Sequence, residues 1–415
     1  MKANGKFEHY NTVTAELPNG LRLIHLPFPS EVAYCGMAIN TGSRDENDEE
    51  QGVAHFIEHL LFKGTDKRRA HHIINRMGNV GGELNAYTTK EETFIYSAFL
   101  TEYYDRAMEL ISDVVFNSSF PEKQIEKERE VILDEINSYI DSPSELIFDD
   151  FENLIYNGTE LGHYILGTPD LLEEIDRNQI VDFYKKYYRP SNMILFSFGK
   201  IPFSKVLRLS EKYFNVECSA QPVAHRSSIV RSQPTQWLTD KQTAQSHVVM
   251  GTYAYDMQDE RRFAFSLLNN VLGGSVINSR LNNSLREKNG LVYHVESNYT
   301  AFTDTGYLSI YYACDKKNRE KCRKLIDKEL ELLINKPLTS AQLTTAKRQY
   351  KGQMGIAFEY NENVALRMAK SFLHYGKYYT LDEVFGFIDA VSATDISNMA
   401  EELFKNNDFF DVSYK

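Results

Sequence analysis

The chain has 415 residues, of which 42% are hydrophobic and 25% charged, and its formal net charge is −12. This length exceeds what a single hydrophobic core usually holds, so two domains of roughly 200 residues are expected. The acidic balance, 58 Asp and Glu residues against 46 Lys and Arg residues, argues against a nucleic-acid-binding protein, which normally presents a basic face.

Neither a membrane span nor a cysteine framework is indicated by the sequence. No run approaches eighteen apolar residues, and the N-terminal segment lacks the apolar core of a signal peptide. The four cysteines form no CxxC pair and show no regular spacing, which argues against a disulfide scaffold and a cysteine zinc site. We therefore expect a protein without a membrane partner, located in the reducing cytoplasm.

The first half of the chain is predicted to begin as a sheet and to continue with helices. In chain order the pattern predicts strands at 14–17, 21–26 and 32–39, a helix at 53–62, a strand at 93–100 and a helix from Pro121 to about residue 139. The Asn19-Gly20 turn joins the first two strands as a hairpin, and Gly64 ends the first helix.

The second half repeats this plan, which predicts an internal duplication. It has strand-like runs from residue 247 and at 307–313, with a helix at 263–272 between them. An offset of 218 residues places Gln124 on Gln342, and IYNG at 155–158 then matches LHYG at 373–376. The polar, proline-containing stretch 219–236 is the predicted linker, which divides the chain into halves at 1–218 and 237–415.

The clearest chemical signal is His55-Phe56-Ile57-Glu58-His59, in the predicted first helix. Histidines four residues apart project from one helix face and can reach a single ion, with Glu58 on nearly the same side. Two neutral nitrogen ligands beside a carboxylate base are what zinc-dependent hydrolysis requires, and HxxEH inverts the common HExxH motif. Incidental polar residues are the alternative, but burying these groups unpaired among apolar neighbours would be costly.

A catalytic zinc ion needs a third protein ligand, which is often a carboxylate. The predicted helix after Pro121 offers Glu128 and Glu135, which are two turns apart and share a face with Ile125 and Ile132. From spacing alone, a solvated glutamate-rich helix is the stronger interpretation of this segment.

HFIEHLLFKGT at 55–65, followed 76 residues after His59 by the last glutamate of EREVILDEI, resembles the M16 family of inverzincin metallopeptidases. That family includes pitrilysin, insulin-degrading enzyme and the mitochondrial processing peptidase. The resemblance extends over nearly the whole chain, and its length is similar to that of the smaller, processing-peptidase-like branch. Further segments that resemble the family are GSRDE at 42–46, GGELNAYTTKEETFIY at 81–96, LGHYILGT at 161–168, YYRPSNM at 187–193 and SRLNNSLREKNGLVY at 279–293.

The resemblance implies roles for the residues of the first half. His55, His59 and Glu135 match the family's zinc ligands, which implies one Zn²⁺ per chain, and Glu58 matches its general base. Glu128 matches a second acidic position, which supports the ligands by contact with them rather than with the metal.

The resemblance also assigns residues that would hold the substrate. Arg286 and Tyr293 match the Arg and Tyr of the family's RExxGLxY segment, which implies contact with the substrate backbone and stabilisation of the oxyanion by Tyr293. Asn85 and Ala86 match the family's substrate-binding edge strand, to which an extended peptide adds through main-chain hydrogen bonds. Without the resemblance, an exposed arginine, a strand tyrosine and an ordinary edge strand are the simpler interpretations.

The second half lacks metal ligands at the corresponding positions. The offset of 218 sets Gln353 against Glu135 and Ala346 against Glu128, and the helix at 263–274 carries no histidine or carboxylate. One catalytic centre per chain is therefore expected. GGSVINSRL at 273–281 is less rich in glycine and serine than the usual family segment, and no long glycine-rich loop follows, so the resemblance to the non-catalytic processing-peptidase subunit is poor.

These observations predict an α+β protein of two homologous halves, each a mainly antiparallel sheet covered by helices, that form a clamshell. With the resemblance, they indicate a zinc-dependent endopeptidase that acts as a homodimer on extended peptides, including basic ones, in an enclosed chamber. A non-catalytic scaffold and a subunit that depends on a different chain are the alternatives. The intact HxxEH with Glu135 argues against the scaffold.

Overall fold

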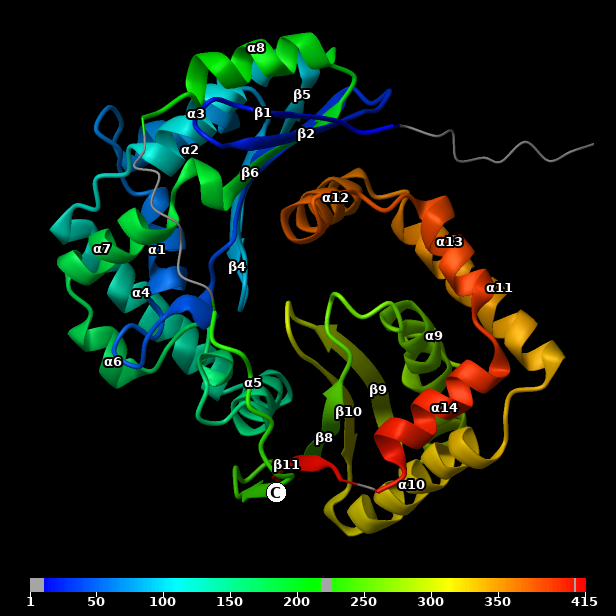
Figure 1. Ribbon diagram of the computed structural model, residues 1–415. Helices are drawn as coiled ribbons and strands as arrows, with labels where there is room; N and C mark the ends of the chain where they lie inside the picture. The colour runs from blue at the N-terminus through cyan, green and yellow to red at the C-terminus, as the bar shows by residue number, and fades with distance from the viewer. Residues whose placement is uncertain (1–10, 218–225, 407) are drawn as a thin grey trace, which may run out of the picture. The chain divides into compact units, whose positions relative to one another are not determined.

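The computed structural model describes residues 11–217, 226–406 and 408–415 (Figure 1). These residues form two compact units, and each unit combines segments from both halves of the sequence. Among the described residues, unit 1 takes in those up to Ile136, His163–Arg226 and Tyr360–Tyr379, and unit 2 takes in Asn137–Gly162, Ser227–Glu359 and Thr380–Lys415.

Unit 1 contains a six-stranded sheet in the order β1-β2-β6-β3-β5-β4. Its strands are β1 (Val13–Glu16), β2 (Arg22–Pro27), β3 (Val32–Ile39), β4 (Glu83–Thr88), β5 (Thr93–Leu100) and β6 (Met193–Gly199). Neighbouring strands are antiparallel except β2 and β6, which are parallel. Strand β4 therefore forms one edge of the sheet, and one side of its backbone has no strand partner among the described residues.

Helices cover both faces of this sheet (Figure 1). On one face the strands and helices share a core that includes Leu23, Met37, Ile57 and Leu195. The helices of that layer are α1 (Val53–Leu61), α2 (Ala70–Gly78), α3 (Tyr104–Phe116), α4 (Glu122–Ile140), α6 (Pro169–Glu174), α7 (Arg177–Tyr187) and α8 (Phe203–Tyr213). The opposite face is covered by α12 (Asn361–Tyr375), which packs on β6 and β3.

Unit 2 contains a five-stranded sheet in the order β7-β11-β8-β10-β9. Its strands are β7 (Gln236–Thr239), β8 (Ser246–Ala254), β9 (Val292–Ala301), β10 (Gly306–Cys314) and β11 (Phe410–Tyr414). β7 and β11 are parallel, and the other pairs are antiparallel. This order reproduces that of β2-β6-β3-β5-β4 in unit 1, so the two units share one topology.

The sheet of unit 2 is also buried on both faces, which explains the continuous apolar runs of its strands. Along β10, Leu308 and Ile310 face one core, while Tyr307 and Tyr311 face the other. One layer comprises α9 (Arg262–Gly273), α10 (Arg319–Asn335), α11 (Ser340–Ala357), α13 (Leu381–Ala390), α14 (Ala393–Phe404) and a π-helix at Asn282–Glu287. The other is α5 (Pro143–Ile155), which packs on β11 and β8.

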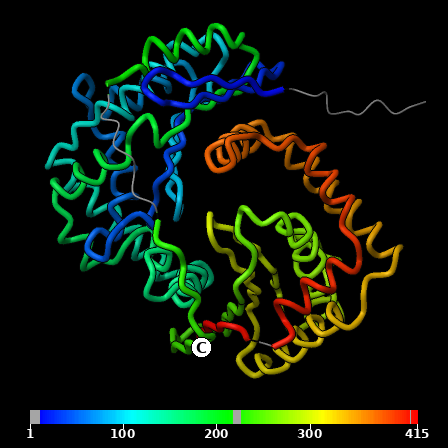
Figure 2. The backbone as a smooth tube through the Cα atoms, in the orientation of Figure 1, coloured from blue at the N-terminus to red at the C-terminus, as the bar shows by residue number. Residues whose placement is uncertain are grey.

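The two units thus exchange one helix each. Helix α5 comes from the first half of the sequence and belongs to unit 2, whereas α12 comes from the second half and belongs to unit 1. Figure 2 shows the second case clearly, since the orange α12 lies beside blue and green strands. The matched segments IYNG and LHYG lie at the C-terminal ends of these two helices, and their last residues, Gly158 and Gly376, have φ of 77° and 67°.

The predicted α+β class, with two mainly antiparallel sheets covered by helices, is confirmed. The predicted hairpin and the helices after Gly52 and Pro121 are present, whereas β6, β7 and β11 were not predicted. The predicted linker 219–236 lies partly outside the described residues, and the boundaries of the two halves stay predictions. Within the described chain, every helix is too short or too polar to cross a bilayer.

Helix α12 is attached to unit 1 by a buried ion pair. The Glu92 carboxylate, at the end of the turn that leads into β5, accepts a hydrogen bond from His374 Nε2 at 2.7 Å and lies 2.7 Å from Lys370 Nζ. Burial alone would raise the pKa of Glu92, but His374 and Lys370 outweigh it and the pKa is lowered.

This pair predicts a pH-dependent contribution to stability. Because the pKa of Glu92 is lower in the folded state, its ionised form stabilises the folded state at pH values above the unfolded-state pKa of about 4.3. This stabilisation is lost as the pH falls towards the folded-state pKa. Glu92→Gln should therefore reduce the free energy of unfolding by roughly 2 kcal/mol at pH 7. Urea unfolding at pH 7 and pH 3 measures this, with the exposed Glu130→Gln as control. A difference from wild type that does not shrink at pH 3 would contradict the prediction.

Candidate metal centre

The position of α1 is fixed at its first turn. Gly52 has a φ of 96°, which glycine adopts without steric cost, and a Cβ there would lie 2.8 Å from the carbonyl oxygen of Leu166. The buried Glu46 carboxylate accepts hydrogen bonds from the backbone amides of Gly52 and Ala54 at 3.0 and 2.7 Å. Glu46 therefore satisfies donors that the first turn of the helix leaves free.

The remainder of α1 divides into an apolar face and a polar face. The residues buried in the core of unit 1 are Val53, Ala54, Phe56, Ile57, Leu60 and Leu61. His55, Glu58 and His59 lie on the other side, and the two imidazole rings are 4.7 Å apart between centroids. Burial of the apolar face thus aims all three polar groups in one direction.

Helix α4 brings a carboxylate to these histidines. Glu135 Oε2 lies 3.9 Å from His55 Nε2 and 3.6 Å from His59 Nε2. Ile125, Ile132 and Ile136 are buried and anchor this face of α4. Within the described chain, His55, His59 and Glu135 are the group of His, Cys, Asp and Glu residues that could hold a metal ion, with ligand atoms within 4.8 Å of one another.

Glu128 contacts the cluster from the side. Its Oε2 lies 3.3 Å from His59 Nδ1, and its Oε1 lies 2.8 Å from Lys63 Nζ. A carboxylate that accepts from Nδ1–H holds the imidazole in the tautomer whose Nε2 carries the free lone pair. His59 therefore presents Nε2 to the position that His55 and Glu135 share.

The donor set fits a zinc ion. Burial, with a further effect of His59, lowers the pKa of His55 to about 3, so its imidazole is neutral at pH 7 and its lone pairs are available. His55 Nδ1 is buried without a hydrogen-bond partner among the described residues, so no hydrogen bond there orients its ring as Glu128 orients that of His59. Two imidazoles and one carboxylate that leave a fourth position open are a typical catalytic zinc set.

Glu58 lies beside this set and does not belong to it. Thr88 Oγ1, at the end of edge strand β4, donates a hydrogen bond of 2.6 Å to Glu58 Oε2. Burial raises the pKa of Glu58, and the hydrogen bond from Thr88 partly offsets this effect. The arrangement places a hydrogen-bonded carboxylate next to three potential metal ligands, a combination suited to moving a proton to and from water.

A cavity of about 480 Å³ opens next to Glu58 and His59. Its apolar lining comes from Phe62, Ile74 and Leu84, and its further lining residues are Lys63, Gly78, Gly82, Glu83 and Asn85. Asn85 and Ala86 lie on β4, opposite Tyr96 and Ile95 of β5. The predicted edge-strand segment therefore borders the cavity as well as the metal centre.

Arg286 and Tyr293 lie in unit 2. Arg286 is in the π-helix and Tyr293 is near the start of β9, with the guanidinium carbon 5.4 Å from the centroid of the tyrosine ring. Tyr293 is 82% exposed, so its hydroxyl is accessible to a ligand. The structure brings these two residues together, and their predicted contact with substrate stays a prediction.

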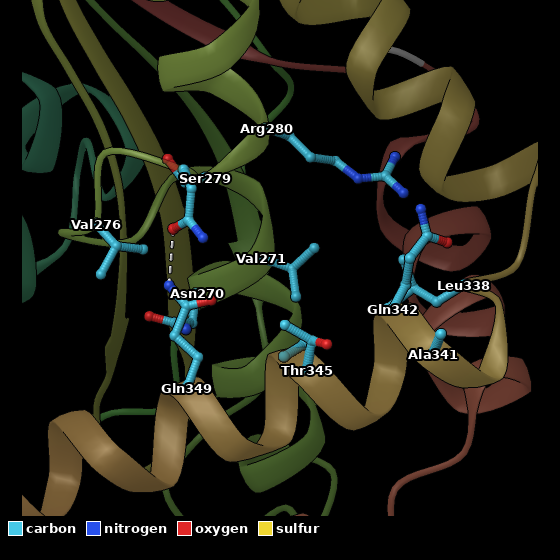
Figure 3. A pocket seen from close by; sticks show the side chains of 12 residues that line it. Asn270, Val271, Val276, Ser279, Arg280, Leu338, Ala341, Gln342, Thr345 and Gln349 are labelled. Atoms are coloured by element: carbon cyan, nitrogen blue, oxygen red, sulfur yellow. Dashed lines mark hydrogen bonds between the residues drawn. The ribbon is translucent and has the colours of Figure 1, made fainter.

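The positions in unit 2 that correspond to Glu128 and Glu135 are occupied by Ala346 and Gln353. Helices α9 and α11 there border a cavity of about 340 Å³ (Figure 3). Its lining residues are Asn270, Val271, Val276, Asn278, Ser279, Arg280, Leu338, Ala341, Gln342, Thr345, Ala346 and Gln349. In the close-up, a dashed line joins Gln349 to the oxygen of Asn278, a hydrogen bond of 2.8 Å. Apolar side chains, amides, hydroxyls and one arginine line this cavity, and none of its lining residues is a histidine or a carboxylate.

Comparison with known families agrees with this division of the chain. Residues 26–169 match the insulinase model of peptidase family M16, and residues 174–350 match the model of the peptidase M16 inactive domain. The first range includes α1 and α4 with the metal centre, and the second includes α9 and most of α11.

Relatives match over nearly the full chain. A Bacillus subtilis protein named uncharacterized zinc protease YmxG is 32% identical over 394 residues, which cover 93% of this chain and 94% of the relative. A Rickettsia felis protein named uncharacterized zinc protease is 30% identical over 407 residues, 96% of each chain. This chain therefore belongs to peptidase family M16, as the sequence motifs predicted.

Solved structures share the fold. A protease from Helicobacter pylori superposes with a TM-score of 0.92 at 22% identity, covering 98% of this chain and 99% of that one. A putative M16-like peptidase from Alicyclobacillus acidocaldarius gives a TM-score of 0.86 at 20% identity, covering 98% of this chain and 99% of that one. At these identities the likeness concerns the fold alone.

Several residues around the centre were not predicted from the sequence. Glu46 caps α1, Lys63 holds Glu128, and Thr88 holds Glu58. For Thr88 a signal existed, because the two-residue period of a strand places it on the same face as Leu84 and Ala86, which pack on the helical core. Lys63 and Glu46 act through contacts that no local spacing encodes.

Loss of one ligand should release the metal. His59→Ala leaves two of the three proposed ligands, so zinc bound after dialysis should fall from about one per chain to about a tenth of that. Elemental analysis of the purified protein measures the ratio. Gln353→Ala, at the position that matches Glu135 in the second half, is the control and should keep its zinc. Full zinc content in His59→Ala would refute this ligand set.

Proposed function

We propose that this protein is a zinc-dependent endopeptidase that hydrolyses peptides or unfolded segments. The observation that carries the proposal is the convergence of His55, His59 and Glu135 within 4.8 Å, with Glu58 beside them. The names of the relatives in family M16 agree with this function.

Each residue of the centre has a distinct proposed role. His55, His59 and Glu135 hold Zn²⁺, which when bound supplies Lewis-acid chemistry by lowering the pKa of water and polarising a carbonyl oxygen. Glu58 takes a proton from the attacking water at its carboxylate and passes it to the leaving amine. Glu128 fixes the ring of His59 through the 3.3 Å contact with Nδ1.

The substrate is proposed to bind as an extended chain along β4. The free side of this edge strand offers main-chain hydrogen bonds to a peptide of almost any sequence. Asn85 and Ala86 would contact the peptide beside the metal centre, since Asn85 borders the same cavity as Glu58 and His59. Arg286 and Tyr293 are proposed to act on the substrate as the family resemblance implies.

Substrate charge and assembly are further proposals. The formal charge of −12 favours basic peptides, an effect that would weaken as ionic strength increases. A homodimer in the cytoplasm is the expected state of the protein. Neither nucleic acid nor a membrane is proposed as a partner.

Glu58→Gln separates catalysis from metal binding. The amide keeps the size of the side chain and an oxygen that accepts from Thr88, but it cannot take a proton. Cleavage of quenched fluorescent peptides should fall by at least about 100-fold, while elemental analysis still finds about one zinc per chain. Substantial activity in this variant would contradict the role of Glu58.

The same assay, run with and without a chelator, distinguishes the alternatives. Chelator-sensitive cleavage by the purified wild-type chain supports the proposed function. A zinc-loaded chain that cleaves no peptide would favour a subunit that needs a different partner chain, and a chain without stoichiometric zinc would favour a scaffold.

The cavity beside Glu58 is proposed to accept an apolar side chain next to the scissile bond. Gly78 lines the cavity, its φ is not positive, and a Cβ built on it meets no atom within 4 Å. Gly78→Phe should therefore reduce the kcat/KM for peptides with large apolar residues about tenfold relative to peptides with alanine there. A peptide library measures the preference.

A matched control for this substitution is Gly352→Phe on α11. Gly352 is also a helical glycine whose Cβ would meet no atom within 4 Å, and it lines no part of this cavity. The Gly352→Phe variant should show the same preference for large apolar residues over alanine as the wild type. If Gly78→Phe leaves the preference for large apolar residues unchanged, the cavity is not part of the substrate site.

A further inference from the structure

Thr88 connects the strand that borders the metal centre to the carboxylate of Glu58. The threonine is the last residue of edge strand β4, and its Oγ1 lies 2.6 Å from Glu58 Oε2. Threonine has one hydroxyl donor, and the structure directs it to one oxygen of this carboxylate. The single hydroxyl hydrogen thus serves Oε2 and not the other oxygen, Oε1.

Thr88 is itself held in place by the turn that follows it. Lys90, Glu91 and Glu92 in this turn are buried charged residues, at 3%, 1% and 2% exposure. Their partners come from separate parts of unit 1: the carbonyl oxygen of His163 for Lys90, the guanidinium of Arg44 at 2.6 Å for Glu91, and His374 at 2.7 Å for Glu92. The turn is therefore tied at three points.

The chemistry of Glu58 needs this kind of support. A carboxylate at the end of a glutamate side chain can rotate, and proton transfer requires one oxygen within hydrogen-bond reach of the water. A fixed donor on Oε2 restricts this rotation and leaves Oε1 for the proton. Displacements of about 1 Å in a reacting group can cost on the order of 100-fold in rate.

We propose that Thr88 is a positioning residue that holds Glu58 Oε2 so that Oε1 faces the attacking water. The inference rests on the proposed function of Glu58 as the base. It goes beyond that function because it makes the end of strand β4 part of the catalytic alignment as well as of the peptide-binding edge.

Two variants test the hydroxyl directly. Thr88→Val keeps the β-branched shape that suits a strand and removes the donor, whereas Thr88→Ser keeps the donor. In the zinc-loaded protein, kcat should fall about tenfold in Thr88→Val, with KM changed less than about twofold and zinc content unchanged, and Thr88→Ser should restore most of kcat. Thr14→Val, on the exposed strand β1 at the opposite edge of the same sheet, should leave kcat and KM unchanged.

A second measurement tests the contact without using activity. Thermal unfolding midpoints are compared, in the presence of a chelator, for wild type, Thr88→Val, Glu58→Ala and the double variant. Thr88→Val should lower the midpoint in the wild-type background and lower it much less in the Glu58→Ala background, because the interaction is already lost there. Equal losses in both backgrounds would overturn the proposed contact.

The two measurements separate the possible failures. If the unfolding cycle shows that Thr88 and Glu58 interact but kcat is unchanged in Thr88→Val, the positioning role is overturned. An increase in KM with unchanged kcat would also overturn it. A wild-type chain without peptidase activity would overturn the proposed function and the positioning role together, while the unfolding cycle would still show whether Thr88 holds Glu58. Loss of kcat that serine does not restore would also overturn the proposal.

Discussion

Helix α1 buries Val53, Phe56, Ile57 and Leu60 in the core of unit 1, and this contact leaves its polar side chains one direction in which to point. They point towards α4 and β4, where Glu135 and Thr88 meet them. The contacts of the centre follow from this burial, because a rotation of α1 would move both imidazoles and the Glu58 carboxylate together. The cap from Glu46 and the close approach at Gly52 oppose such a rotation at the N-terminal end of the helix.

The two units share one topology, but among the described residues only unit 1 brings together side chains that could hold a metal ion. Both units use the same strand order, and both place a helix from the other half of the sequence on the second face of the sheet. In unit 2 the counterparts of Glu128 and Glu135 are Ala346 and Gln353, and no histidine or carboxylate is among the lining residues of the cavity that α9 and α11 border. The two units therefore share a fold but differ in the ionic side chains at these positions.

The sequence predicted elements whose pattern is local and left open those decided by distant contacts. Helical periodicity predicted α1 and α4, and the four-residue spacing of His55 and His59 predicted a metal site. Spacing alone did not favour Glu135 as a ligand, since Glu128 shares its face, and the family resemblance was needed to assign it. The exchange of α5 and α12 was not predicted, because an amphipathic pattern shows that a helix buries one face but not which sheet it covers. Lys63 and Glu46 act through tertiary contacts that no local spacing encodes, whereas the strand period gave the face of Thr88 but not its contact with Glu58.

The most direct test of this account is X-ray absorption at the zinc edge of the purified, zinc-loaded protein, because it reports the atoms that bind the metal. We expect nitrogen and oxygen neighbours at about 2.0–2.2 Å, with the scattering pattern of two imidazoles. One imidazole should disappear from this pattern when His55 is replaced by alanine and zinc is resupplied. A sulfur neighbour near 2.3 Å, or a spectrum that does not change in the His55→Ala protein, would contradict the proposed centre.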